Sequence, residues 1–277
     1  MEIVREVDAL KSRRPAWPGP VGLVPTMGYL HEGHVELVRR ARAANATVVV
    51  SIFVNPTQFG PSEDYGRYPR AFERDCGMLE AAGTDVVFSP APSAIYPDGF
   101  SSWVVVEGVT GRLEGASRPG HFRGVATVCN KLFNIVNPAR AYFGQKDAQQ
   151  VAVIQRMVRD LNMNLDIVVV PTVREADGLA MSSRNSYLSA EHRAAAPVLY
   201  RALTAARRMR DEGRDADAIR LKMAEVVGAE PLAVLDYASI VNPSTFEEAR
   251  SLDGPSLAVL AVRFGATRLI DNMRLDQ

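Results

Sequence analysis

The chain has 277 residues, which is enough for one large or two modest domains with a substantial core. Hydrophobic residues make up 47% of it and charged residues 23%, and 32 basic side chains balance 32 acidic ones. This balance excludes a bulk attraction to nucleic acid or to a membrane surface, so any anionic ligand must be bound by a local arrangement of groups.

The N-terminal segment and the cysteines predict a cytoplasmic protein. Residues 1–6 are mixed in charge and lack the basic start and apolar stretch of a signal peptide. The longest apolar run, residues 46–54, is far too short to span a membrane. Cys76 and Cys129 each fall in a helical apolar pattern, which favours buried free thiols in a reducing compartment.

Apolar segments alternate with helical patterns through about residue 172. Strands are predicted at residues 21–25, 47–54, 85–88, 140–143 and 166–170. They are rich in β-branched residues and apolar throughout, which suits a parallel sheet covered on both faces. Helices are predicted over residues 122–136 and from Pro69 onward. The alternation predicts an α/β fold with a doubly wound, Rossmann-like parallel sheet.

The pattern changes after residue 173. Two helices rich in alanine and arginine are predicted at about 190–211 and 215–227, followed by strands at 234–241, 257–264 and 268–271. Helices grouped ahead of strands indicate an α+β arrangement. The sequence therefore predicts a Rossmann-like domain over residues 1–173 and a second, smaller α+β domain over residues 174–277.

Residues 25–34 read Pro-Thr-Met-Gly-Tyr-Leu-His-Glu-Gly-His, between the first predicted strand and a helical pattern. A strand, a glycine-bearing turn and a helix N-terminus together direct free backbone N–H groups and the positive end of the helix dipole at an anion. His31 and His34 lie one turn apart, so both can reach the same anion. We interpret the segment as a phosphate-binding turn. Glycines that merely permit the turn and histidines that cap the helix are the alternative.

Two better-known motifs do not fit this segment. Gly28 and Gly33 have the spacing of a P-loop, but His34-Val35 stands where Lys-Ser/Thr is required. The histidine pair resembles that of zinc proteases, whose motif needs two residues after the glutamate rather than one.

Polar residues also follow two other predicted strands, at the ends where open α/β sheets bind ligands. After the second strand, the neutral amide of Gln58 can donate to a carboxylate or hydroxyl, although residues 55–60 could equally form an ordinary turn. After the fourth strand, Lys146 is one of only four lysines and would meet a phosphate as a compact cation. Asp147 is either a helix N-cap or an acceptor for a ribose hydroxyl, and Gln150 lies one turn further on.

The last polar segment, residues 181–185, reads Met-Ser-Ser-Arg-Asn at the predicted domain junction. Serine hydroxyls and a guanidinium can wrap polyphosphate oxygens, and arginine does so bidentately. Taken in isolation, a solvated linker is the simpler interpretation.

Taken together, these segments resemble the pantoate–β-alanine ligase (pantothenate synthetase) family. The resemblance also runs through residues 68–70, 113–124 and 171–185 and covers about two thirds of the chain, so several motifs occur in the right order. The family belongs to the nucleotidyltransferases that carry a His-x-x-His phosphate motif and a second, mobile phosphate loop, here Ser182-Ser183-Arg184.

The resemblance implies an AMP-forming acid–amino-acid ligase. The carboxylate of pantoate would attack the α-phosphorus of ATP to give pantoyl adenylate and pyrophosphate, and the amine of β-alanine would then release AMP and pantothenate. A carboxylate is already ionised at neutral pH. The first step therefore depends on positioning two anions and neutralising charge on the leaving pyrophosphate.

The resemblance also assigns roles by position. The triphosphate would be held by His31, His34, Lys146, Ser182, Ser183 and Arg184, of which both histidines, Lys146 and Arg184 would be catalytic. The rest of ATP would meet Asp147 and the backbone of Gly144 at the ribose, and Val173 and Met181 at the adenine. Pantoate would be bound by Gln58 and Gln150, with Pro25, Phe53 and Met27 packed on its dimethyl group; Met27 would also contact ATP.

Further expectations follow from the resemblance. Mg²⁺ would be held mainly by phosphate oxygens, with Asp75 as a possible indirect ligand. Arg74 stands where some relatives have another acid, so no direct protein ligand is predicted. A homodimer is implied, and the second domain would close over the nucleotide as a lid. No general base for the β-alanine amine is evident.

Three family-like residues, Glu114, Arg118 and His121, are predicted to form a structural loop over the site. Two other functions remain as alternatives. A nucleotidyltransferase that makes a dinucleotide-type product would share the histidine turn but would not need paired glutamines. A non-catalytic nucleotide sensor would be favoured by loss of the phosphate-binding cations, and these are present.

Overall fold

The computed structural model describes residues 1–61 and 63–276, and its contacts divide the chain into two units. One unit comprises Met1–Gly144 and Val153–Val170, and the other comprises Gln145–Ala152 and the chain from Pro171 onward. The predicted division after residue 173 differs from this grouping at residues 171–173 and in the segment Gln145–Ala152. The predicted second domain ends at residue 277, which lies outside the described residues.

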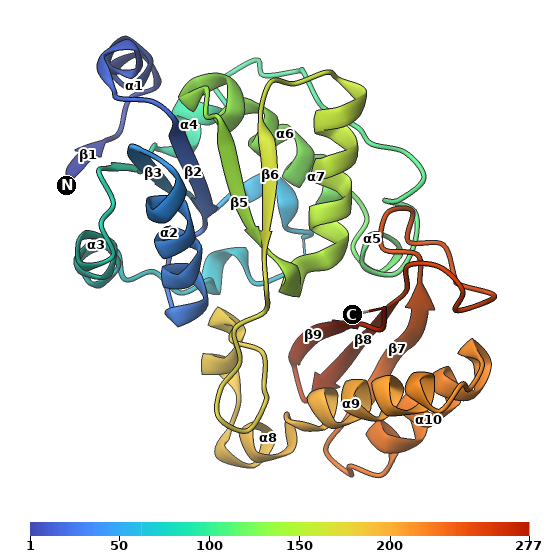
Figure 1. Ribbon diagram of the computed structural model, residues 1–277. Helices are drawn as coiled ribbons and strands as arrows, with labels where there is room; N and C mark the ends of the chain where they lie inside the picture. Colours follow the sequence, from blue (N-terminus) through green and yellow to red (C-terminus); the bar gives the residue numbers. More distant parts are fainter. Residues whose placement is uncertain (62, 277) are drawn as a thin grey trace. The chain divides into compact units, whose positions relative to one another are not determined.

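A six-stranded parallel sheet forms the centre of the first unit (Figure 1). Its strands, in spatial order, are β1 (Glu2–Val4), β4 (Val86–Phe88), β3 (Thr47–Ile52), β2 (Val21–Thr26), β5 (Arg140–Gly144) and β6 (Asp166–Val170). The five predicted strands and their parallel pairing are confirmed. The sequence did not reveal β1, because a three-residue edge strand with two exposed positions has no apolar run.

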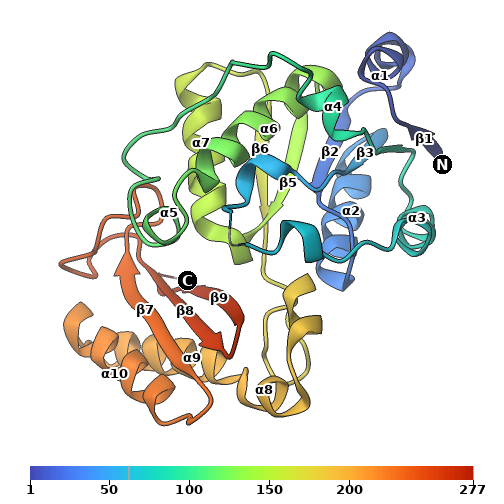
Figure 2. The ribbon, with the colours of Figure 1, turned by 180° about the vertical axis from the view of Figure 1, so that it is seen from behind.

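Helices cover both faces of this sheet (Figures 1 and 2). The helices in this part of the chain are α1 (Val7–Arg13), α2 (Glu32–Ala44), α3 (Phe72–Ala81), α4 (Pro92–Ile95), α5 (Glu114–Ser117), α6 (His121–Val136) and α7 (Ala148–Asp160). Consecutive side chains of β5 point to opposite faces of the sheet, so they contact different helices. The Tyr142 hydroxyl accepts from the Asn45 amide at 2.7 Å, just after α2, whereas the ring of Phe143 lies 6.4 Å from that of Phe133 on α6.

The predicted start of α3 at Pro69 is wrong. Ala71 has a non-helical backbone (φ −148°, ψ 57°), and its carbonyl accepts the first helical bond from Asp75 at 2.8 Å. The Arg70 guanidinium donates to the carbonyl of Tyr68 at 3.2 Å, so these residues form a separate turn ahead of the helix. Both cysteines are buried free thiols, as predicted.

The strand order places β2 at the switch point of the sheet. From β2 the chain turns to β3 and β4 on one side, while β5 and β6 lie on the other. In open α/β sheets, ligands bind beyond the carboxyl ends of the strands at such a point. The segment after β2, with its two histidines, is therefore located where a ligand is expected.

The second unit has an antiparallel sheet of β7 (Val234–Val241), β8 (Leu257–Phe264) and β9 (Thr267–Arg274), packed with α9 (Val198–Asp211) and α10 (Ala216–Gly228). The single helix predicted over 190–211 is instead two, because Pro197 lacks an N–H and separates α8 (Ala190–Ala195) from α9. The last strand is longer than predicted, because it pairs with the whole of β8. No described helix has the length and apolar character needed to cross a membrane.

Candidate active site

The turn after β2 is held by one buried carboxylate. Gly28 has φ +82°, a conformation that glycine adopts without strain. Asp75, on α3 and only 1% exposed, accepts from the backbone N–H of Tyr29 at 2.6 Å and of Leu30 at 2.9 Å. A Cβ at Gly28 would lie 3.2 Å from the Asp75 carboxylate, so the glycine also lets this group approach closely. The hydrogen bonds to Asp75 therefore fix the backbone conformation of this turn.

The two histidines of this turn lie against each other. His31 is the extended residue ahead of α2, His34 lies in the first turn, and their ring centroids are 4.0 Å apart. His34 Nδ1 accepts from the backbone N–H of His31 at 3.3 Å. A neutral imidazole that accepts at Nδ1 carries its proton on Nε2. His34 thus presents an Nε2–H donor at the positive end of the α2 dipole.

Asp75, predicted as a possible indirect metal ligand, makes its hydrogen bonds to the turn after β2. Both of its carboxylate oxygens accept backbone N–H groups of the turn. The neighbouring Arg74 donates to the carbonyl of Leu30, and its guanidinium lies 4.9 Å from the centroid of the Tyr29 ring. The described residues contain no group of three or more His, Cys, Asp or Glu side chains placed to hold a metal ion. Asp75 and Arg74 therefore both support the histidine turn.

Gln58 is fixed at the carboxyl end of β3, in the short helix η2 (Pro56–Gln58). Asn55, 1% exposed, donates through Nδ2 to Gln58 Oε1 at 3.0 Å. The remaining amide nitrogen, Gln58 Nε2, lies 3.2 Å from the Met27 sulfur. A Cβ at Gly124 would lie 2.4 Å from the carbonyl oxygen of Thr57, so α6 packs directly on η2. The structure thus brings together Gln58 and Met27 from two adjacent strand ends.

Two other residues predicted to contact pantoate lie on the same pair of strands. Pro25 is in β2, opposite Ser51 of β3. Phe53 directly follows β3, is 5% exposed, and donates its backbone N–H to the Thr26 carbonyl at 3.0 Å. The first unit therefore gathers Pro25, Met27, Phe53 and Gln58 at neighbouring strand ends.

A hydrogen-bond network of His121, Arg118 and Glu63 holds the backbone of Gln58. The sequence did not predict this contact with Gln58. His121, 8% exposed, lies with Nδ1 2.9 Å from the Gln58 carbonyl, which can only accept, so Nδ1 carries the proton. The other ring nitrogen accepts from Arg118 at 3.2 Å. Arg118 also pairs with both carboxylate oxygens of Glu63, at 2.7 and 2.6 Å. Arg118 and His121 therefore hold the backbone of Gln58, and the spacing Arg-x-x-His was the available signal. His121 is the first residue of α6 rather than part of a loop, and the loop over the site stays a prediction.

Burial lowers the pKa of His121 to about 4 from its usual value of 6.5. The Arg118 cation adds to this shift, while the hydrogen bond to Gln58 and the charge of Glu63 oppose it. The imidazole is therefore neutral at physiological pH, which is the state required to donate at Nδ1 and accept at Nε2.

This shift predicts a pH-dependent stability. Between pH 7 and pH 5 the unfolded chain takes up a proton at His121 but the folded chain does not, so folding weakens as pH falls, by about 2 kcal/mol. In His121→Gln the decrease over the same interval should be smaller by that amount. Urea unfolding of both proteins at the two pH values measures it. Equal decreases in the two proteins would contradict the depressed pKa.

Lys146 lies in the short helix η4 (Gln145–Asp147), which directly follows β5. Its Nζ is 3.5 Å from a carboxylate oxygen of Asp147, and the two side chains are 19% and 47% exposed. The pair belongs to the second unit, as does Gln150 in the first turn of α7. The lysine is thus mostly covered, while the carboxylate is accessible.

Residues 173–181 form a short hairpin in the second unit. Met181 donates its backbone N–H to the Val173 carbonyl at 3.0 Å, and Arg174 pairs with Ala180 as an antiparallel bridge. The two residues predicted to line an adenine pocket therefore lie side by side.

The serine- and arginine-containing segment continues this hairpin into the short helix η5 (Ser183–Tyr187). Ser182 Oγ accepts from the backbone N–H of Arg184 at 3.2 Å, and Ser183 is 8% exposed. Asn185 donates its side-chain amide to the Ala180 carbonyl at 3.1 Å. These bonds order the segment, so the interpretation as a solvated linker does not hold.

The chain is similar to known proteins over almost its whole length. The family model described as pantoate-beta-alanine ligase matches residues 2–274. A pantothenate synthetase from Herpetosiphon aurantiacus is 58% identical over 275 residues, covering 99% of each chain. The crystal structure of pantothenate synthetase from Thermus thermophilus has a TM-score of 0.95 and 51% identity over 99% of both chains.

A further solved structure is similar over the whole chain. It is the pantoate-beta-alanine ligase from Francisella tularensis, complexed with beta-gamma ATP and beta-alanine. Its TM-score is 0.83 and its identity 35%, over 100% of this chain and 98% of that one. The resemblance seen in the sequence is confirmed, and the chain belongs to the pantoate–β-alanine ligase family.

Proposed function

We propose that this chain condenses (R)-pantoate with β-alanine at the expense of ATP, through a pantoyl adenylate, releasing AMP and pyrophosphate. Family membership supports this reaction. The observation that carries it is the placement of the His31–His34 pair after β2 and of Gln58 after the adjacent β3. One strand end offers donors for phosphate, and its neighbour offers an amide and apolar side chains for a small hydroxy acid.

The first step needs position rather than acid–base chemistry. A pantoate carboxylate oxygen bonds to the α-phosphorus, and the bond from that phosphorus to the bridging oxygen of pyrophosphate breaks. Charge then develops on the leaving pyrophosphate, where His34 Nε2–H and the Lys146 ammonium would stabilise it. In the second step the β-alanine nitrogen bonds to the acyl carbon, loses a proton, and AMP leaves with the mixed-anhydride oxygen.

The nucleotide would be bound largely by the second unit. Lys146 and the segment 182–184 would hold the triphosphate together with the histidine turn, and Asp147 and the Gly144 backbone would bind the ribose. The exposed carboxylate of Asp147 supports that role. Val173 and Met181, joined by a backbone hydrogen bond, would form one wall of the adenine pocket.

Pantoate would be bound by Gln58 and Gln150, with Pro25, Met27 and Phe53 against its dimethyl group. Asn55 supports this role for Gln58, because it occupies the amide oxygen and leaves the nitrogen as the donor. A neutral amide can bind the pantoate carboxylate without neutralising its charge, so the carboxylate remains a nucleophile.

We further propose that Mg²⁺ enters as part of the ATP substrate, bound mainly by phosphate oxygens. Residues 174–277 would act as a domain that closes over the nucleotide. Family membership also favours a homodimer, which light scattering of the purified protein tests. Two buried free thiols favour a cytoplasmic location.

Exchange of labelled pyrophosphate into ATP tests the reaction. Exchange should require pantoate and should not require β-alanine, because the first step alone is reversible. A nucleotidyltransferase with a dinucleotide-type product would exchange only when a mononucleotide acceptor replaces pantoate, and a nucleotide sensor would not exchange with either acceptor. Either result would reject the ligase.

A further inference from the structure

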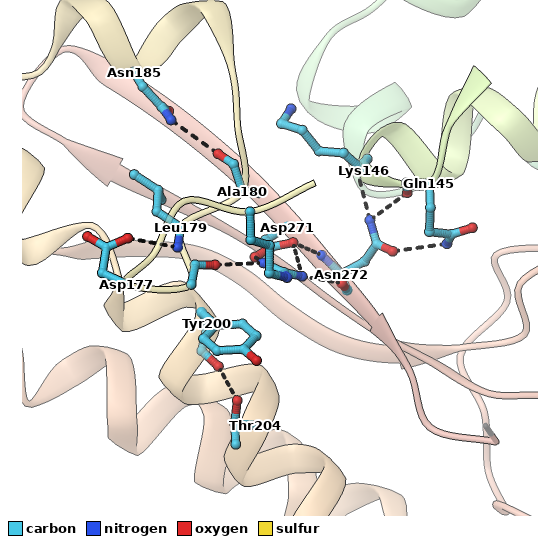
Figure 3. A network of polar contacts seen from close by, with 12 residues as sticks. Gln145, Lys146, Asp177, Leu179, Ala180, Asn185, Tyr200, Thr204, Asp271 and Asn272 are labelled. Carbon is cyan, nitrogen blue, oxygen red and sulfur yellow. Dashed lines mark hydrogen bonds and ion pairs between the residues drawn. The ribbon is translucent and has the colours of Figure 1, made fainter. Parts of the chain in front are cut away.

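Asn272 of β9 makes three side-chain hydrogen bonds to the turn that carries Lys146 (Figure 3). Its Nδ2 donates to the carbonyls of Gln145 and Lys146, each at 2.9 Å, and its Oδ1 accepts from Gln145 Nε2 at 3.0 Å. The side chain is 4% exposed, so solvent competes little for these bonds. In Figure 3 the Lys146 side chain extends away from Asn272, so the contact leaves its ammonium group available.

Asn272 is itself fixed by its neighbour in the strand. The carboxylate of Asp271 accepts from the backbone N–H of Asn272 at 2.8 Å and from both Arg174 terminal nitrogens, at 2.6 and 3.0 Å. Arg174 also donates to the Asn272 carbonyl at 3.3 Å. Asp271 is 3% exposed, and a buried bidentate pair of this kind has a well-defined geometry.

Arg174 extends the same network to the second phosphate-binding segment. It donates to the Gly178 carbonyl at 3.0 Å, within the hairpin that leads to Ser182, and its guanidinium lies 4.6 Å from the centroid of the Tyr200 ring. A Cβ at Gly178 would lie 2.0 Å from that ring, so the hairpin is packed tightly against α9. The dipeptide Asp271–Asn272 thus holds both the turn Gln145–Asp147 (the lysine turn) and the base of the hairpin of residues 173–181.

We propose that Asn272 is a positioning residue for adenylate formation, which fixes the backbone of Lys146 so that its ammonium meets the leaving pyrophosphate. This rests on the proposed function. A lysine side chain is long and flexible, so the position of its charge depends on where its backbone is held. Asparagine suits this role because one amide donates to two successive carbonyls and accepts from a third group. Leucine has a similar size and makes none of these bonds.

The test is Asn272→Leu, assayed by pantoate-dependent pyrophosphate exchange. We expect kcat to fall by about 10- to 30-fold, because a misplaced group loses transition-state contact. The KM for pantoate should change less than twofold, because the turn does not bind pantoate. In the double variant with Lys146→Ala, exchange should be as slow as in Lys146→Ala alone, because Asn272 acts through the lysine. Multiplied effects in the double variant would overturn the proposal.

Controls separate this role from general stability. Ser239→Ala removes a 3.0 Å hydrogen bond to Glu248 in the same three-stranded sheet, away from the lysine turn, and should leave exchange unchanged. If Asn272→Leu does not fold, Asn272→Ser retains one donor and should give an intermediate loss of kcat. Failure of both variants to fold, or normal kcat in either, would overturn the proposal. Wild-type protein without pantoate-dependent exchange would reject the proposed function instead.

Discussion

Lys146→Ala should slow pantoate-dependent pyrophosphate exchange by about 10²-fold or more. The reason is charge: the leaving pyrophosphate gains negative charge in the transition state, and a mostly covered ammonium stabilises it more strongly than water does. Because this stabilisation is greatest in the transition state, kcat should fall far more than the affinity for ATP. Exchange rates at saturating ATP and pantoate measure the effect.

A second lysine of the same unit provides the matched control. Lys222 lies on α10 and pairs with the exposed Glu225 at 2.7 Å. Lys222→Ala removes the same charge without touching the proposed site, so its exchange rate should equal that of the wild type. Lys146→Ala with near-normal exchange would show that another group neutralises the pyrophosphate.

His34→Ala should also slow exchange by about 10²-fold or more, by removal of a fixed donor. The backbone N–H of His31 holds His34 Nδ1, so the ring presents Nε2–H without reorganisation when charge develops. Because His34 lies in the first turn of α2, the positive end of the helix dipole stabilises the same negative charge. Single-turnover formation of the adenylate, followed by quenching, isolates this step from the attack of β-alanine.

His192 offers the comparison for this variant. It lies on α8 with its ring 6.4 Å from that of Phe264, in the second unit. His192→Ala should leave adenylate formation unchanged, provided that both variants are compared as folded protein by circular dichroism. Equal losses in the two histidine variants would indicate destabilisation rather than a lost donor at the phosphate.

The sequence by itself determined the local elements of the site. The apolar run before the histidine turn and the periodic residues after it correctly predicted β2 and α2, and all of Val35, Leu37, Val38 and Ala41 are buried. The same holds for the three strands of the second unit. These features are readable because side-chain periodicity and turn chemistry act within a few residues of the chain.

Only the tertiary structure decided which strands are neighbours and which buried groups hold the site. β2 lies between β3 and β5, an order that no local pattern encodes. Asp75 is 46 residues from Tyr29, whose backbone N–H it accepts, and Asn272 is 127 residues from Gln145. Hydrogen bonds between such distant residues leave no periodic trace in a single sequence. They form only when packing of the apolar faces brings the two segments together and excludes the water that would otherwise satisfy them.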